Sequence, residues 1–110
     1  MVAGYHSCMD KIAMLTEILA QNPNDAFARY GLAMAYAAEG RDDEALAAYA
    51  ETTERNPDYV PAYQMSAQLL VKLQRYDEAR ARVEAGLAAA DRTGNAHAAA
   101  EMSALLEELR

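Results

Sequence analysis

The chain repeats itself after 34 residues. The matching positions include charged residues and prolines, which recur by chance less readily than alanine: Asn22-Pro23 with Asn56-Pro57, Arg41 with Arg75, and Asp43-Glu44-Ala45 with Asp77-Glu78-Ala79. A fixed period of this length is typical of architectures in which each unit is one small supersecondary structure that stacks on the next. The repeat therefore limits the chain to a stack of similar units.

Each unit is predicted to contain two helices. About a quarter of the residues are alanine, which has the highest helix propensity, and there are only 5 Gly and 3 Pro. Gly40 provides the left-handed backbone that ends a helix, and Asp42 is expected to cap the next one. Pro23 and Pro57 fit beyond helix ends, because proline cannot continue a helix. The four expected helices are about 25–39 and 42–55, then 58–73 and 76–90.

Two further helices are predicted at the ends of the chain, because hairpin repeats need caps over their outer apolar faces. Residues from about 7 to 21 place Cys8, Ile12, Leu15 and Leu19 on one face. The last helix, at about 95–109, carries Ala98, Met102, Leu105, Leu106 and Leu109, with Glu101, Glu107 and Glu108 expected on its outer face. The prediction is one all-α domain of six helices without strands, divided into 1–21, 26–59, 60–91 and 95–110. Its turns are expected near Asn22-Pro23, Gly40-Arg41, Asn56-Pro57, Gln74-Arg75 and 93–95.

The pattern resembles the tetratricopeptide repeat, in the form of a small, bacterial-type protein with two full repeats and flanking helices. In the first unit the residues that match the family pattern are Leu32, Ala33, Tyr36, Ala45, Tyr49 and Pro57. In the second unit they are Tyr63, Ala67, Leu70, Ala79, Val83 and Gly86. The chain departs from the pattern at Arg29, where an aromatic residue is expected, and at Ser66, where Leu is expected. The second unit also closes without its Pro. The resemblance implies a right-handed solenoid of antiparallel helix hairpins.

The resemblance also implies a concave groove, lined by the first helix of each repeat, that binds a protein or peptide. The positions that would contact the ligand are Phe27, Tyr30, Met34, Ala37, Gln64, Gln68, Val71 and Lys72. Tyr and Met suit recognition, because one is rigid and amphipathic and the other is deformable. The alternative is that Phe27, Tyr30 and Met34 pack against the first helix of the chain.

Charge predicts the character of the groove. The predicted first helices hold few ionised groups, whereas acidic residues concentrate on the second helices and on the last helix. We therefore expect a nearly neutral, largely apolar groove and a partner with apolar side chains, with the acidity mainly on the convex side and at one end. Some members of the family bind a terminal carboxylate through Lys and Asn. Tyr30 and Met34 stand where that site would begin, so this ligand class is not expected.

Composition and motifs disfavour several other functions. A net charge of −7 repels phosphate backbones, so no nucleic-acid partner is expected. His6, His97 and Cys8 lack the convergent ligands that a metal needs. Asp42, Asp43 and Glu44 cluster at a helix start, where the helix dipole favours negative charge. Since no phosphate-binding loop or catalytic arrangement is found either, the chain is predicted to be a non-enzyme without cofactor or metal.

The sequence also bears on location and assembly. No apolar run approaches the ~18 residues needed to span a bilayer, and the first residues do not resemble an export signal, so a cytoplasmic protein without a membrane partner is expected. The leading functional prediction is a non-enzymatic adaptor that binds a protein or peptide. Two alternatives remain open: a self-associating structural module, such as a homodimer, and an accessory subunit of an enzyme or larger complex.

Overall fold

The computed structural model describes residues 8–110 and contains six α-helices and no strand in that range. They are α1 (Cys8–Gln21), α2 (Ala26–Ala38), α3 (Asp42–Arg55), α4 (Val60–Lys72), α5 (Tyr76–Thr93) and α6 (Ala96–Glu108). The predicted number of helices and the five turns are confirmed. The predictions for His6 and for the Cys8 side chain lie outside the described part of the molecule.

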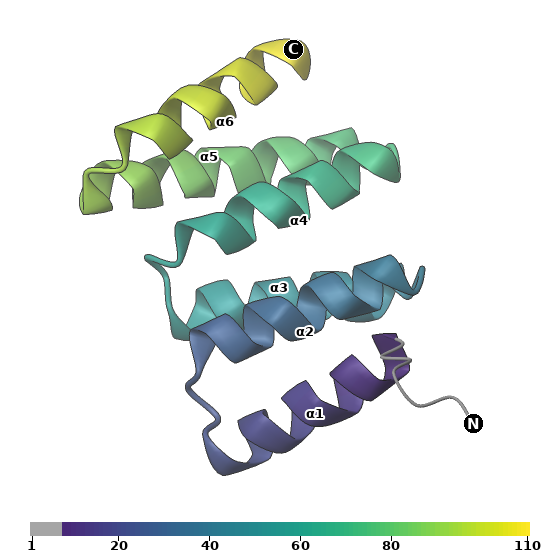
Figure 1. Cartoon of the computed structure of the whole chain (residues 1–110). Coiled ribbons are helices and arrows are strands. Elements are labelled where there is room, and N and C mark those ends of the chain that lie inside the picture. Colours follow the sequence, from purple (N-terminus) through teal and green to yellow (C-terminus); the bar gives the residue numbers. More distant parts are fainter. Residues whose placement is uncertain (1–7) are drawn as a thin grey trace.

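The helices form an elongated stack measuring 49 × 28 × 20 Å. The hairpins α2–α3 and α4–α5 lie side by side, and α1 and α6 flank them (Figure 1). Within the hairpins, α2 and α4 form one layer, while α3 and α5 lie behind them in the view shown. Each helix packs mainly against its neighbours in the sequence. None of the described helices is long and apolar enough to cross a membrane.

Small residues allow the helices to approach closely. Ala33, Ala45, Ala67 and Ala79 are completely buried, as the repeat pattern predicts. A β-carbon on Gly86 would lie 2.5 Å from the sulfur of Met102 and 2.8 Å from the β-carbon of Tyr63. Larger side chains at these positions would therefore push neighbouring helices apart.

Three left-handed turns end α2, α4 and α5. The residues at these turns are Gly40, Gln74 and Gly94, with φ angles of 76°, 62° and 68°. After each of them, the next residue donates its amide hydrogen to a carbonyl five residues earlier, at 2.8–2.9 Å: Arg41 to Tyr36, Arg75 to Leu70, and Asn95 to Ala90. These bonds satisfy carbonyl groups that a helix end leaves without partners.

The predicted cap at Asp42 is wrong. The N-cap residue of α3 is Arg41, whose side chain makes no capping hydrogen bond, and Asp42 is already the first helical residue. Arg41 instead donates to Glu44 at 2.7 Å, one turn into the helix. Arg75 and Glu78 form the equivalent pair at the start of α5. The Asp-Asp-Glu and Asp-Glu runs thus place negative charge in the first helical turns, where the helix dipole favours it.

The second hairpin differs from the first in the length of its second helix. The helix α5 has 18 residues and ends at Thr93, whereas α3 has 14 and ends before Asn56-Pro57. Without a proline at the corresponding position, α5 continues three residues beyond its predicted end. The helices α2, α4 and α6 begin at residues 26, 60 and 96, so α6 lies outside the 34-residue register.

Candidate functional site

The surface of α2 carries two exposed apolar side chains. Phe27 is 75% exposed and Met34 is 38% exposed, and they lie two helical turns apart. The alternative in which these residues pack beneath α1 therefore fails for Phe27 and for much of Met34. Large apolar groups exposed in this way are available to an incoming partner.

Tyr30, between them in the sequence, is partly buried and packs against the core. Its ring lies 6.1 Å from that of Tyr49 and 5.4 Å from that of Tyr59, measured between centroids. Burial raises the pKa of Tyr30, and raises the pKa of the fully enclosed Tyr49 to about 12. Ala37 is likewise half-buried and packs against the same cluster. Tyr30 is thus held by its contacts with the core. Phe27 and Met34 are the exposed apolar side chains on this part of α2.

The predicted residues on α4 have a more polar environment. Gln64 and Gln68 line a pocket of about 200 Å³ together with Glu101 and Glu108 of α6. The amide of Gln64 donates a hydrogen bond of 2.8 Å to Glu101. Farther along α4, Val71 packs against the core and Lys72 is exposed.

The two glutamates correct the predicted charge distribution. Glu101 and Glu108 were assigned to the outer face, and the groove was expected to be nearly neutral. Instead, both carboxylates face the same pocket as Gln64 and Gln68. The buried face of α6 is the predicted one, with Met102 and Leu109 enclosed, and both glutamates are exposed as expected. The difference lies in their neighbours, because the groove was predicted from α2 and α4 alone and α6 was not expected to border it. The candidate surface therefore has an apolar region on α2 and an acidic region between α4 and α6.

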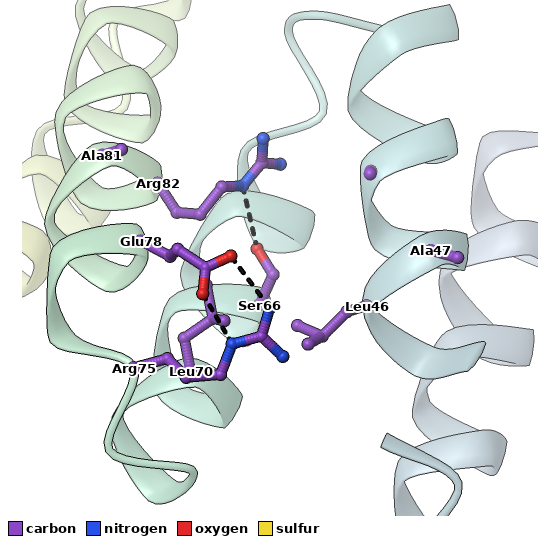
Figure 2. Close-up of a pocket in the computed structure, with 9 residues that line it drawn as sticks. Leu46, Ala47, Ser66, Leu70, Arg75, Glu78, Ala81 and Arg82 are labelled. Atoms are coloured by element: carbon purple, nitrogen blue, oxygen red, sulfur yellow. Dashed lines mark hydrogen bonds and ion pairs between the residues drawn. The ribbon is translucent and has the colours of Figure 1, made fainter. Parts of the chain in front are cut away.

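A larger hollow, which the sequence reasoning missed, lies between α3 and α5. It has a volume of about 420 Å³, its floor includes Ser66 and Leu70 of α4, and Arg82 of α5 borders it (Figure 2). Ser66 stands where the repeat pattern requires Leu, so the sequence did contain a signal for missing volume at this position. Within the described residues, no group of three or more His, Cys, Asp or Glu side chains could hold a metal ion.

Comparison with known proteins agrees with this architecture. A family model described as tetratricopeptide repeat matches residues 12–66 and 43–105. The chain belongs to the tetratricopeptide repeat family. No curated protein matches it in sequence.

Several solved structures are similar. A tetratricopeptide repeat domain protein from Salinibacter ruber is 29% identical, with a TM-score of 0.76 over 81% of this chain and 90% of that one. The TPR2B domain of yeast Sti1, in a complex with pHsp70, is 24% identical, with a TM-score of 0.84 over 93% and 82% of the two chains. PcrH, in complex with the chaperone binding region of PopD, is 19% identical, with a TM-score of 0.84 over 93% and 77%.

Proposed function

We propose that this chain is a non-enzymatic module that binds a segment of a partner protein on the surface formed by α2, α4 and α6. The observation that carries the proposal is the exposure of Phe27 and Met34 beside the partly buried Tyr30. Binding energy is usually concentrated in a few large side chains that become buried at the centre of an interface. A partner that inserts apolar side chains against α2 would cover these groups.

Two of the similar structures support a binding role. The Sti1 domain is in complex with pHsp70, and PcrH is in complex with the chaperone binding region of PopD. Both match over nearly the whole length of this chain, although their low sequence identity makes them guides to fold. Their ligands suggest the class of partner, a protein or peptide, and leave its sequence open.

The acidic region refines the kind of partner. Glu101 and Glu108 favour a basic or hydrogen-bond-donating residue in the segment that reaches the pocket between α4 and α6. The proposed partner segment therefore combines apolar side chains at α2 with a donor group near α6. With a net charge of −7, the chain as a whole opposes a nucleic acid in this role.

The test begins with capture of binding proteins by the purified chain, followed by titration of the recovered partner. The double variant Phe27→Ala, Met34→Ala should weaken binding by at least about 1 kcal/mol, because both groups are exposed and would be buried by the partner. Tyr30 is unsuitable for this test because its ring supports the core. Tyr76→Ala is the matched control, since Tyr76 is an exposed aromatic residue at the start of α5.

The charged region requires a separate pair of variants. Glu108→Gln should weaken binding and reduce its dependence on salt, whereas Glu107→Gln should have little effect, because Glu107 does not line the pocket. If the Phe27 and Met34 double variant binds as tightly as the wild type, the proposed surface is wrong.

Self-association is the alternative function that the exposed apolar groups on α2 would also serve. Light scattering of the purified chain separates the two functions. A dimer that dissociates in the Phe27→Ala, Met34→Ala variant would assign this surface to pairing of two copies, whereas a monomer would leave it free for another protein.

A further inference from the structure

The hollow is lined by residues of α3, α4 and α5. The helices α3 and α5 form the layer behind α2 and α4, which carry most of the proposed partner-binding surface (Figure 1). The walls of the hollow carry the small residues Ala47 and Ala50 on α3 and Ala81 on α5. Leu46 and Leu70 make much of the remaining lining apolar. A volume of about 420 Å³ falls in the range of ligand sites and exceeds what one side chain fills.

A residue smaller than the repeat pattern requires lies on the floor of the hollow. The corresponding position in the first unit is Leu32, whereas the second unit has Ser66. The hydroxyl of Ser66 turns back to the carbonyl of Ala62 at 2.7 Å, so it does not extend into the open space. The floor of the hollow at this position therefore carries a shorter side chain than the family pattern provides.

Arg82 gives this space a specific charge. Its Nε donates to the hydroxyl of Ser66 at 3.3 Å and its Nη2 to the hydroxyl of Thr53 at 2.7 Å. The guanidinium also lies 4.8 Å from the centre of the Tyr63 ring. All three partners are neutral, and within residues 10–110 Arg82 forms no ion pair. Figure 2 shows the side chain extending from α5 toward Ser66 at the edge of the hollow.

The contrast with the neighbouring arginine identifies Arg82 as the available cation. Arg75, at the other end of the hollow, donates to both carboxylate oxygens of Glu78, at 2.5 and 2.9 Å. Partial burial lowers the pKa of Arg82, whereas hydrogen bonding to Glu78 raises the pKa of Arg75. A partly buried guanidinium without a counter-ion is a costly arrangement that an incoming carboxylate would relieve.

We propose that this hollow is a second binding site, which takes a segment of a partner protein in which an aliphatic side chain adjoins an aspartate or glutamate. The aliphatic group fills the space above Ser66 between the alanines, and the carboxylate pairs with Arg82. Charge complementarity selects this occupant, because Arg75 in the lining is already paired with Glu78, whereas the hydrogen-bond partners of Arg82 are neutral. The lining of the hollow shares no residue with the proposed partner-binding surface, although α4 contributes residues to both.

The probe is the blocked dipeptide Ac-Leu-Glu-NH2, titrated into the full chain and followed by the NMR signals of the alanine methyl groups. Ala47, Ala50 and Ala81 should shift, and Ac-Leu-Gln-NH2 should bind about tenfold more weakly, because it lacks the charge that pairs with the guanidinium. Shifts confined to α2 and α6, equal affinity for the two dipeptides, or no shift at millimolar concentration would each overturn the proposal.

Two variants test separately the charge of Arg82 and the open volume of the hollow. Arg82→Gln should reduce the affinity for Ac-Leu-Glu-NH2 about tenfold and make the two dipeptides equivalent. Arg92→Gln is the matched control, because it removes the same charge from an exposed ion pair on the same helix and should leave the tenfold preference intact. Ala81→Leu fills the hollow without touching Arg82 and should abolish binding of both probes, so the test still works if Arg82→Gln unfolds. Self-association of the wild type that Arg82→Gln abolishes would assign the hollow to a second copy and overturn the proposal.

Discussion

Gln74 adopts a backbone conformation that suits glycine. Its φ of 62° places it in the left-handed region, where a β-carbon is strained, and its counterparts at the ends of α2 and α5 are Gly40 and Gly94. The side chain of Gln74 is exposed, so the residue contributes little packing that would compensate for the strain.

Replacing Gln74 with Gly should therefore stabilise the protein. The gain expected is about 0.5–1 kcal/mol, which is the relief of left-handed strain less the greater entropy that glycine gives the unfolded chain. Urea denaturation would measure it as a higher midpoint with an unchanged slope. Gln74→Ala is the control, because it keeps the β-carbon and should bring no such gain. Gly40→Gln should cost about 1 kcal/mol.

The buried Tyr49 should make the protein less stable at alkaline pH. Burial raises its pKa from 10.0 to about 12, so above pH 10 the unfolded chain loses this proton while the folded chain retains it. Stability is complete below pH 10 and falls as the pH rises through about 12, by about 2–3 kcal/mol in total. Melting temperatures measured between pH 8 and pH 12 would show the decline. Tyr49→Phe should flatten it, although Tyr30 and Tyr59, whose pKa values are also raised, would leave part of the slope.

For single residues, the sequence predicted which side chains are buried better than it predicted which side chains they contact. The four alanines at repeat positions could be placed in the core, because a 34-residue period fixes their helical phase. The partial burial of Tyr30 could not be read from its helix alone, since the rings of Tyr49 and Tyr59 that cover it come from α3 and from the residue before α4. The hollow above Ser66 required knowledge of how far neighbouring side chains extend.

Among the elements, α3 and α5 depend on small residues where they contact α2 and α4. Ala45→Leu or Ala79→Leu should destabilise the protein by about 1–3 kcal/mol, because both positions are completely buried and the added atoms have no space. Ala47→Leu should cost less than about 0.5 kcal/mol, since Ala47 is exposed and lies beside open volume. Thermal unfolding of the three variants provides the comparison. Similar losses at all three positions would contradict the observed orientations of α3 and α5.

Helix ends were predicted most accurately where a glycine, a proline or the repeat marks them. The ends of α2, α3 and α4 lie within about one residue of prediction, because Gly40, Asn56-Pro57 and the repeat itself mark them. The end of α5 has no proline and was predicted too early. The apolar face of α6 was nevertheless predicted correctly, with Ala98, Met102 and Leu109 buried, because the helical spacing of its own apolar residues marks it.

For the whole molecule, α6 completes the core. Met102 is fully buried among residues of α4 and α5, and Leu109 is also buried. Deleting residues 95–110 would expose the face of α5 that carries Val83 and Gly86. Each buried leucine or methionine contributes about 1.5–3 kcal/mol, against a typical total stability of about 5–15 kcal/mol.

The shortened chain should consequently melt at a much lower temperature or aggregate. Circular dichroism during heating, combined with light scattering, would record either outcome. Removing Arg110 alone is the control and should leave the melting temperature unchanged, because that side chain is 68% exposed. An equally high melting temperature after deletion of 95–110 would show that α6 is dispensable for folding.

The packing of each helix on its neighbours in the sequence has a consequence for how the chain acquires its structure. Contacts that are local along the chain close short loops, which cost little entropy and form rapidly. During synthesis, each hairpin can assemble soon after its second helix leaves the ribosome, without waiting for a distant segment. The apolar faces of α4 and α5 that α6 covers in the folded protein stay uncovered until α6 has been synthesised. The nascent chain is therefore most exposed to chaperones and to aggregation in the interval before α6 emerges.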